Sequence, residues 1–412
     1  MNLLIQNIRQ LVTAASSGKP YKTGKEMREL HVVENAAVLV ENGIIRKIGP
    51  TESLTADRSI ETLDAGGRVA LPGFVDSHTH TVFAGSREHE FAMRSEGKSY
   101  QEIAAAGGGI LSTMHATRAA SKKELLRSAE RRLNEMMQHG TTCVEIKSGY
   151  GLSAEGESKM LDVIHDLRRD HYVTIIPTFL AAHAIPPEFK DDKNGYVDLI
   201  MNRMLPYVGE RQLAIFCDVF CDEGYFDTHH TEQILTEAKR YGLIPKVHAD
   251  QLAAIGGTEL AAHLNALSVD HLEHITDKGI AALRQSSTIA TVLPGSSFFL
   301  NHPFAPARSI IDANVPLAIA TDFNPGSSMS FSMPLMMTIA CTHMRMTPEE
   351  AITASTLNGA AALGISNEVG SIEVGKQADI VLYDVPNYLT IPYHYGINHV
   401  WKVIKNGTVL EF

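Results

Sequence analysis

Residues 121–146, SKKELLRSAERRLNEMMQHGTTCVEI, place a helix directly before a strand. Ser121 and Glu124 have the spacing of a capping box, apolar residues then recur at helical intervals, and Gly140 ends the pattern. Residues 141–146 form a mainly apolar and β-branched run, which is typical of a buried strand. The stretch therefore predicts one helix–strand unit of an α/β fold.

The same alternation recurs along the middle of the chain. Helical segments separate eight runs that are typical of buried strands: residues 69–75, 141–146, 174–180, 215–220, 244–247, 266–269, 288–293 and 317–320. Eight mainly apolar strands alternating with helices favour a closed parallel (β/α)8 TIM-like barrel over a doubly wound sheet.

Both ends of the chain have a different pattern. Residues 1–66 contain short β-like runs joined by the hairpin signal Asn42-Gly43, and residues 372–412 contain similar runs. We therefore expect a small β-sandwich domain built from residues 1–66 plus 372–412. The barrel domain is expected to span residues 67–371.

The composition is that of a folded globular enzyme, with 44% hydrophobic and 20% charged residues. The 36 Lys and Arg residues against 47 Asp and Glu residues give a formal charge of −11 without a basic stripe, so nucleic acid is not an expected partner. No apolar run approaches the roughly 18 residues of a membrane span, and the amino terminus lacks a signal-peptide pattern. The four cysteines form no CxxC pair, which fits a reduced, cytoplasmic chain. A homodimer is left open.

Polar side chains follow several of the predicted strands. In a (β/α)8 barrel the active residues lie at the carboxyl ends of the strands. His78 and His80 follow the first predicted strand, His248 follows the fifth and Asp322 follows the eighth. An HxH pair alone is a weak motif, but its two imidazoles project from one face of a strand. Three histidines with one carboxylate suit Zn²⁺ or iron, so we predict a metal site on these four residues.

Residues 72–80, PGFVDSHTH, with His248, His271 and Asp322 behind them, resemble the amidohydrolase superfamily of metal-dependent hydrolases. Three further segments resemble the imidazolonepropionase family: residues 83–87 (FAGSR), 145–152 (EIKSGYGL) and 178–184 (TFLAAHA). The resemblance covers essentially the whole chain. It implies hydrolysis of the cyclic amide C–N bond of 4-imidazolone-5-propanoate to N-formimidoyl-L-glutamate, in the cytoplasm, during histidine degradation.

The resemblance also implies a role for each site residue. A divalent metal lowers the pKa of its bound water to about 7, Asp322 takes the proton, and His271 donates to the carbonyl oxygen as it becomes an oxyanion. Arg87 is the partner of the propanoate, and a surface salt bridge with Glu88 or Glu90 is the alternative. The other substrate-binding positions are Tyr150, His183, Gln251, Asn324, Gly326 and Ser327.

Two positions separate the chain from related enzymes. Relatives that deaminate nucleobases carry Glu three residues after the histidine of the fifth strand, whereas this chain has Gln251, which cannot exchange a proton. We expect Gln251 to bind the ring by hydrogen bonds. The end of the fourth strand, residues 217–223, has no lysine that carboxylation could turn into a metal bridge. A single divalent or trivalent metal ion, Zn or Fe, is therefore expected.

Two alternatives stay open: another cyclic-amide hydrolase or deaminase of the superfamily, and a non-catalytic scaffold relative. Gln251 and Arg87 disfavour the first, and the complete ligand set disfavours the second. Residues 107–109, GGG, lack the Gly-Lys-Ser/Thr of a phosphate loop and are predicted to form a flexible loop, and a role as a lid over the substrate is left open. Lys147 is assigned either to the site or to a solvated loop, and Glu273 is given no role.

Overall fold

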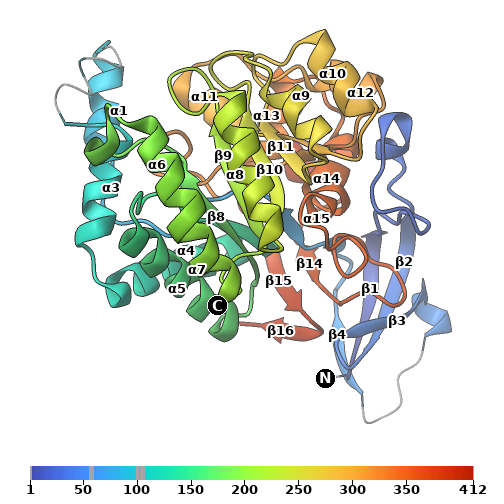
Figure 1. Cartoon of the computed structure of the whole chain (residues 1–412). Helices are drawn as coiled ribbons and strands as arrows, with labels where there is room; N and C mark the ends of the chain where they lie inside the picture. The colour runs from blue at the N-terminus through green and yellow to red at the C-terminus, as the bar shows by residue number, and fades with distance from the viewer. Residues whose placement is uncertain (1, 55–59, 99–101, 103–106, 412) are drawn as a thin grey trace.

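The computed structural model describes residues 2–54, 60–98, 102 and 107–411 of the chain. Its strands form two separate sheets of eight strands each (Figure 1). One sheet lies among the helices, and the other, at the lower right of the view, joins strands from both ends of the chain. We call the first the barrel sheet and the second the terminal sheet.

The barrel sheet consists of β6 (Phe74–Asp76), β7 (Thr141–Lys147), β8 (Thr174–Ala182), β9 (Phe216–Cys221), β10 (Ile244–Ala249), β11 (Ser268–His271), β12 (Ile289–Val292) and β13 (Leu317–Ile319). These strands lie side by side in chain order, and all neighbours are parallel. The two outer strands meet just beyond their ends, because Asp322 N–H donates to His78 O at 3.0 Å and His80 N–H donates to Phe323 O at 2.9 Å. The predicted parallel barrel is confirmed.

One predicted strand is divided between the two sheets. Residues 69–75 were expected to form the first barrel strand, but the chain forms β5 (Val69–Pro72) in the terminal sheet and β6 in the barrel sheet. Gly73 lies between them, and its N–H donates to Asp379 O at 2.9 Å. Proline has no N–H for a strand ladder, and glycine permits a bend, so the chain changes sheets here. The other seven barrel strands overlap their predicted ranges.

Helices alternate with the barrel strands. In α4 (Lys122–Gln138), the Ser121 side chain accepts from the Glu124 N–H and Glu124 bonds back, which confirms the predicted capping box. The other helices are α1 (Glu88–Ser95), α3 (Ile110–Ala119), α5 (Ala154–Asp170), α6 (Lys193–Leu199), α7 (Leu205–Glu210), α8 (Thr228–Arg240), α9 (Gly257–His263), α10 (Asp277–Arg284), α11 (Pro294–Leu300), α12 (Ala307–Asp312), α13 (Met333–His343), α14 (Pro348–Ser355), α15 (Leu357–Ala361) and α16 (Thr390–Tyr393), with a short 3-10 helix η1 (Gly24–Arg28). Leu133 and Met136 of α4 are fully buried, so its apolar face belongs to the core.

The terminal sheet is built from β1 (Asn2–Val12), β2 (Val32–Glu41), β3 (Ile44–Pro50), β4 (Glu61–Asp64), β5, β14 (Ile380–Tyr383), β15 (Val400–Lys405) and β16 (Thr408–Leu410). β1 pairs with β2 and β5, and β5 pairs with β14, so both ends of the chain share this sheet. Ile5, Ile8 and Ile380 belong to a hydrophobic cluster of its own. The domain ranges 1–66 plus 372–412 and 67–371 stay predictions.

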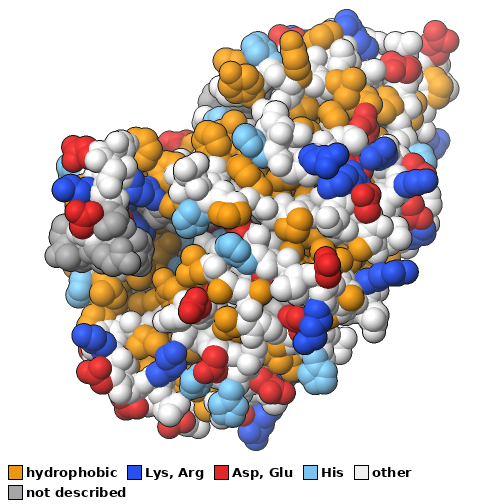
Figure 2. Space-filling view, turned by 90° about the horizontal axis from the view of Figure 1, so that it is seen from above, with side chains coloured by type: hydrophobic (Ala, Val, Ile, Leu, Met, Phe, Trp, Pro, Cys, Tyr) orange, Lys and Arg blue, Asp and Glu red, His pale blue; other side chains and the backbone are white. Residues whose placement is uncertain are grey.

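The surface carries charges of both signs. Figure 2 shows Lys, Arg, Asp and Glu side chains interspersed over one face of the molecule, and histidine side chains reach the same face. Among the helices that the structure describes, none is long and apolar enough to cross a membrane.

Candidate active site

Five polar side chains gather at the carboxyl end of the barrel strands. His78 and His80 follow β6, His248 lies in β10, His271 ends β11 and Asp322 follows β13. Each is at most 2% exposed. Since all barrel strands are parallel, their carboxyl ends meet at one rim. The structure therefore brings together the four predicted metal ligands and His271.

The ligand atoms of these side chains have distances that suit one small ion. Asp322 Oδ1 lies 3.5 Å from His78 Nε2 and 3.6 Å from His80 Nε2. Ligand atoms of His78, His248 and His271 also lie within 4.8 Å of one another. Ligands that each lie about 2.0–2.2 Å from a transition metal have such mutual distances. These side chains could hold a metal ion.

The surroundings of two imidazole nitrogens indicate whether the site fits a metal ion. His78 Nε2 and His248 Nε2 are buried and have no hydrogen-bond partner among the described residues. A buried polar atom without a partner is costly, and a bound cation would satisfy both. Burial also holds the pKa of each ring well below its usual value, so both rings are neutral and offer a lone pair. The residues present fit a transition metal.

The other ring nitrogen, Nδ1, of His78 and of His248 lies beside an aspartate carboxylate. Asp270 Oδ2 lies 2.7 Å from His78 Nδ1, and Asp218 Oδ2 lies 2.9 Å from His248 Nδ1. At His78 this contact is a hydrogen bond, which fixes the tautomer and leaves Nε2 free to bind a metal, and at His248 the carboxylate lies within ion-pair distance. Neither aspartate is predicted from the sequence, because Asp270 is 192 positions from His78 and no spacing rule connects them.

Next to the histidines lie five buried charged residues, which we call the interior charge cluster: Glu145, Lys147, Asp218, Lys246 and Asp270. Lys147 Nζ donates to Glu145 at 2.9 Å and to Asp218 at 2.7 Å, and Lys246 Nζ donates to Glu145 at 2.7 Å. Burial opposes the charge of Lys147, but Asp218 and Glu145 outweigh it and raise its pKa. The solvated-loop interpretation of Lys147 is therefore wrong: it ends β7, and carboxylates balance its charge inside the barrel.

Asp322 contacts both the histidines and the loop that follows it. Ser327 Oγ donates to Asp322 Oδ2 at 2.9 Å, while Oδ1 faces the two histidines of β6. Burial raises the pKa of Asp322 to about 6. A carboxylate with such a pKa is suited to accept a proton and to release it near neutral pH.

His271 has a strained backbone, with φ at 87°. Positive φ at a residue with a side chain costs energy and clusters at functional sites. Its Nδ1 lies 3.5 Å from Glu273 Oε1, and Ser297 Oγ donates to the same oxygen at 3.3 Å. Burial alone would lower the pKa of His271, but Glu273 outweighs it and raises this pKa. Glu273, which has no role in the sequence prediction, is in contact with His271 and restrains its ring.

Arg87 lies directly before α1 and is partly buried against Glu90. Arg87 Nη2 is 2.7 Å from Glu90 Oε2, and the two side chains are 14% and 12% exposed. The salt bridge with Glu90 is therefore present, although it is not a surface pair. Arg87 Nε is buried and has no hydrogen-bond partner within the described part of the chain. This N–H is free to bind a further acceptor.

The loop after β13 packs against Arg87. A Cβ at Gly326 would collide with Arg87 Nη1, so the close approach requires glycine. Asn324 Oδ1 accepts from the N–H groups of Gly326 and Ser327 at 2.8 Å each, and Asn324 Nδ2 donates to Asp322 O at 2.6 Å. The polar atoms of Asn324 shape the loop, and the loop connects Arg87 to Asp322.

Tyr150 and His183 lie beside His80. The ring of Tyr150, which is 2% exposed, has its centroid 5.7 Å from that of His80. The ring of His183 stacks on His80 at 4.8 Å. His183 Nδ1 donates to Gly149 O at 3.1 Å, and burial lowers the pKa of His183 to about 4. Its Nε2 is therefore a hydrogen-bond acceptor.

Gln251 follows β10, three residues after His248, and is partly buried. Its N–H and those of Leu252 and Ala253 donate to the carboxylate of Asp222 at 2.8 to 2.9 Å. No side-chain hydrogen bond of Gln251 is found among the described residues. The backbone of Gln251 is thus fixed close to His248, and the role of its amide stays a prediction.

The predicted flexible loop, residues 107–109, adjoins residues 103–106, which lie outside the described ranges. Gly109 is buried, and its N–H donates to Glu90 Oε1 at 2.9 Å. The carboxylate of Glu90 therefore joins this segment to Arg87. A role as a lid stays open.

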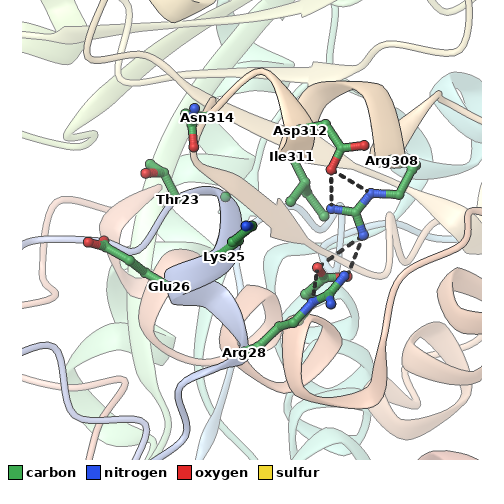
Figure 3. A pocket seen from close by; sticks show the side chains of 10 residues that line it. Thr23, Lys25, Glu26, Arg28, Arg308, Ile311, Asp312 and Asn314 are labelled. Carbon is green, nitrogen blue, oxygen red and sulfur yellow. Dashed lines mark hydrogen bonds and ion pairs between the residues drawn. The ribbon is translucent and has the colours of Figure 1, made fainter.

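A cavity of about 390 Å³ opens between η1, α12 and α14 (Figure 3). Glu350 accepts from Arg28 Nε and from Arg308 Nη1 at 2.9 Å each, and Arg308 Nη2 lies 2.8 Å from Asp312 Oδ1. None of the predicted site residues lines this cavity. Its ion pairs join three helical segments, so we assign them to stability.

Comparison with known proteins identifies the family. The amidohydrolase family model matches residues 222–410. The imidazolonepropionase of Geobacillus thermodenitrificans is 48% identical over 413 residues, which cover 99% of this chain and 97% of that protein. The imidazolonepropionase of Clostridium tetani is 46% identical over 412 residues, which cover 99% of this chain and 98% of that protein.

Solved structures have the same fold. An adenosine deaminase from Xanthomonas campestris with bound zinc has a TM-score of 0.74 and 19% identity, and the match covers 99% of this chain and 92% of that one. A triazine hydrolase variant has a TM-score of 0.75 and 16% identity, with 99% and 94% covered. At such identities the likeness concerns the fold alone. The full-length identity to named relatives shows more: this chain belongs to the imidazolonepropionase family of the amidohydrolases.

Proposed function

We propose that this chain hydrolyses the cyclic amide C–N bond of 4-imidazolone-5-propanoate to N-formimidoyl-L-glutamate, a step of histidine degradation in the cytoplasm. One observation carries the proposal: Asp322, one of the five buried side chains at the rim, leads into the loop that packs against Arg87, and Arg87 has a buried N–H with no partner among the described residues. The rim residues support hydrolysis, and Arg87 supports a substrate with a carboxylate.

His78, His80, His248 and Asp322 would hold one transition metal ion, Zn or Fe. When bound, the ion supplies Lewis-acid chemistry and an activated water. Three neutral imidazoles and one carboxylate suit either metal. The two aspartates at Nδ1 of His78 and His248 hold these rings in the orientation that binding requires.

Asp322 is placed to accept the proton of the attacking water. Attack on the ring carbonyl makes its oxygen negative, and His271 is placed to donate to that oxygen. Glu273 lies against Nδ1 of His271 and raises the pKa of this ring, so the protonated ring can donate from its other nitrogen to that oxygen. When the C–N bond breaks, Asp322 returns the proton to the departing ring nitrogen. The oxygen of the water stays in the new carboxylate, one of its protons reaches the nitrogen through Asp322, and the new carboxyl group releases the second proton on ionisation.

Arg87 is placed to pair with the propanoate. A guanidinium and a carboxylate form two parallel hydrogen bonds, which fix the orientation of the substrate as well as adding binding energy. Tyr150 and His183 would contact the imidazolone ring, since both lie beside His80. The remaining proposed contacts come from Gln251, Asn324, Gly326 and Ser327.

The test follows the consumption of enzymatically generated 4-imidazolone-5-propanoate by the purified chain, with the metal content measured on the same sample. We expect N-formimidoyl-L-glutamate to form at a rate that rises with metal content. An imidazolone without the propanoate is the control and should react poorly. Preferential turnover of a nucleobase or of another cyclic amide would contradict the proposal.

A further inference from the structure

The segment from Ser148 to Leu152 carries Tyr150 and has a strained backbone. Gly149 has φ at 109°, and Leu152 has φ at 48°. A left-handed conformation is costly at a residue that carries a side chain such as Leu. Contacts from outside the segment must therefore hold it in place.

Glu157, in the first turn of α5, provides such contacts. Its side chain is buried, with 1% of the residue exposed. Its carboxylate accepts from the N–H groups of Gly149 at 3.1 Å, Gly151 at 2.8 Å and Leu152 at 2.8 Å. No ion pair of Glu157 is found among the described residues, and burial raises its pKa. The hydroxyl of Ser148 and the three N–H groups compensate the buried carboxylate in place of a cation.

Arg118 of α3 binds the backbone carbonyl groups of the same segment. Its Nε donates to Gly151 O at 2.6 Å, and its Nη2 donates to Leu152 O at 2.9 Å. The segment is thus fixed through its N–H groups by Glu157 and through its carbonyls by Arg118. Few rearrangements of Tyr150 are compatible with both sets of bonds.

The same segment also fixes His183. Gly149 donates its N–H to Glu157, and its carbonyl accepts from His183 Nδ1 at 3.1 Å. A carbonyl can only accept, so Nδ1 carries the proton and Nε2 has the lone pair. Because the His183 ring stacks on His80, this lone pair belongs to a ring that adjoins the metal ligands.

We infer that Glu157 is a positioning residue that fixes the backbone of Tyr150 and the tautomer of His183. The relevance to catalysis rests on the proposed function, in which both residues contact the substrate. The tautomer itself is a property of the chain alone, so it can be tested without a substrate.

The kinetic test uses Glu157→Gln. Glutamine has nearly the same shape, but its amide offers one acceptor oxygen, and its NH2 group would oppose the N–H groups of the segment. We expect kcat/KM to fall by about 10- to 100-fold, because small displacements of positioning groups have effects of this size. Metal content should be unchanged. Unchanged kcat/KM in a folded Glu157→Gln would overturn the inference.

Glu350→Gln is the matched control. Glu350 is also a buried carboxylate in the first turn of a helix, but it lies in the ion pairs around the cavity of Figure 3. This variant should lose stability and keep kcat/KM. An equal loss of kcat/KM in both variants would mean that Glu157→Gln lowers kcat/KM only by destabilising the fold, and it would contradict a positioning role for Glu157. Should Glu157→Gln not fold, Glu157→Asp, which keeps the charge and shortens the side chain, replaces it.

The spectroscopic test measures the ¹⁵N chemical shifts of the histidine rings in the zinc-loaded protein, with His183→Asn used to assign the His183 signals. The wild type should show the Nδ1–H tautomer at His183, and Glu157→Gln should show a mixture. The same single tautomer in both proteins would overturn the inference. Failure of the wild type to hydrolyse 4-imidazolone-5-propanoate would instead overturn the proposed function, whatever the tautomer.

Discussion

The Nε–H of Arg87 is buried and has no partner in the described ranges, while its Nη2 is held by Glu90. In the proposed function the propanoate of the substrate supplies the missing acceptor. We predict that Arg87→Met lowers kcat/KM for 4-imidazolone-5-propanoate. The decrease should correspond to a loss of roughly 2–5 kcal/mol in transition-state stabilisation. Arg87→Lys should cost less, since lysine keeps the charge but not the planar fork. Steady-state kinetics of the three proteins gives the comparison.

An imidazolone without the propanoate is the control for Arg87. The wild type should handle it poorly, and Arg87→Met should lose little further activity on it. Metal content should match the wild type, because Arg87 is not among the proposed ligands. Equal losses on both substrates would show that Arg87 supports the fold instead of the propanoate.

The proposed role of Asp322 depends on its carboxylate, which would accept the proton of the attacking water. Asn at this position keeps one oxygen for coordination but can neither accept a proton nor supply negative charge. We predict that Asp322→Asn lowers kcat by roughly 100- to 10,000-fold and changes the midpoint of thermal unfolding little. Ser327→Ala, which removes the hydrogen bonds of the Ser327 hydroxyl to Asp322 and to Asn324 but keeps the carboxylate, is the milder control. A normal rate for Asp322→Asn across neutral pH would remove Asp322 from the role of base.

At the scale of elements, Glu350 connects three of them. It lies in α14, completes the capping box with Thr347, and accepts from Arg28 of η1 and Arg308 of α12. Glu350→Gln removes the carboxylate that Arg28 and Arg308 share and leaves Arg308 with Asp312 alone. We predict a loss of roughly 1–3 kcal/mol in the free energy of unfolding, with the share of the half-exposed Arg28 reduced by solvent screening.

Chemical denaturation of Glu350→Gln with metal bound measures this loss. The slope with denaturant should match the wild type, which would show that the unfolded surface is the same. Arg28→Ala should cost less than Glu350→Gln, because Glu350 keeps Arg308. An unfolding free energy equal to that of the wild type would mean that these ion pairs add no net stability.

At the scale of the whole molecule, the proposed ligands come from β6, β10 and the loop after β13. β6 and β13 are the outer strands of the barrel sheet, which meet only beyond their ends. A metal ion would therefore join the two edges that the sheet itself leaves unpaired. Binding to the folded chain at 100 times the dissociation constant adds about 2.7 kcal/mol to its stability.

We predict that chelation of the metal lowers the midpoint of thermal unfolding, and that Zn²⁺ restores it. Calorimetry with and without a chelator gives the measurement. His248→Ala should show a smaller difference between the two conditions, since it lacks one ligand. An identical midpoint with and without metal would contradict a stabilising ion at this rim.

Local patterns determine the elements and the placement of the proposed ligands. The capping box at Ser121, the strand at residues 141–146 and the HxH spacing of His78 and His80 each depend on neighbours within a few positions. Residues so close in sequence have fixed relative positions in a helix or a strand. Counting eight such strands was enough to predict the barrel, and the barrel places polar strand ends at one rim.

Only the tertiary structure decides which side chains hold these residues in place. Asp270 meets His78 across 192 positions, and Glu273 restrains His271 by a local contact that no motif marks. Lys147 follows an ordinary strand, yet its charge is buried among carboxylates from other strands. The burial of a charge depends on partners that arrive only when the barrel closes. A local pattern contains no information about those partners, so the sequence was enough to propose the ligands, whereas the fold decided which side chains support them.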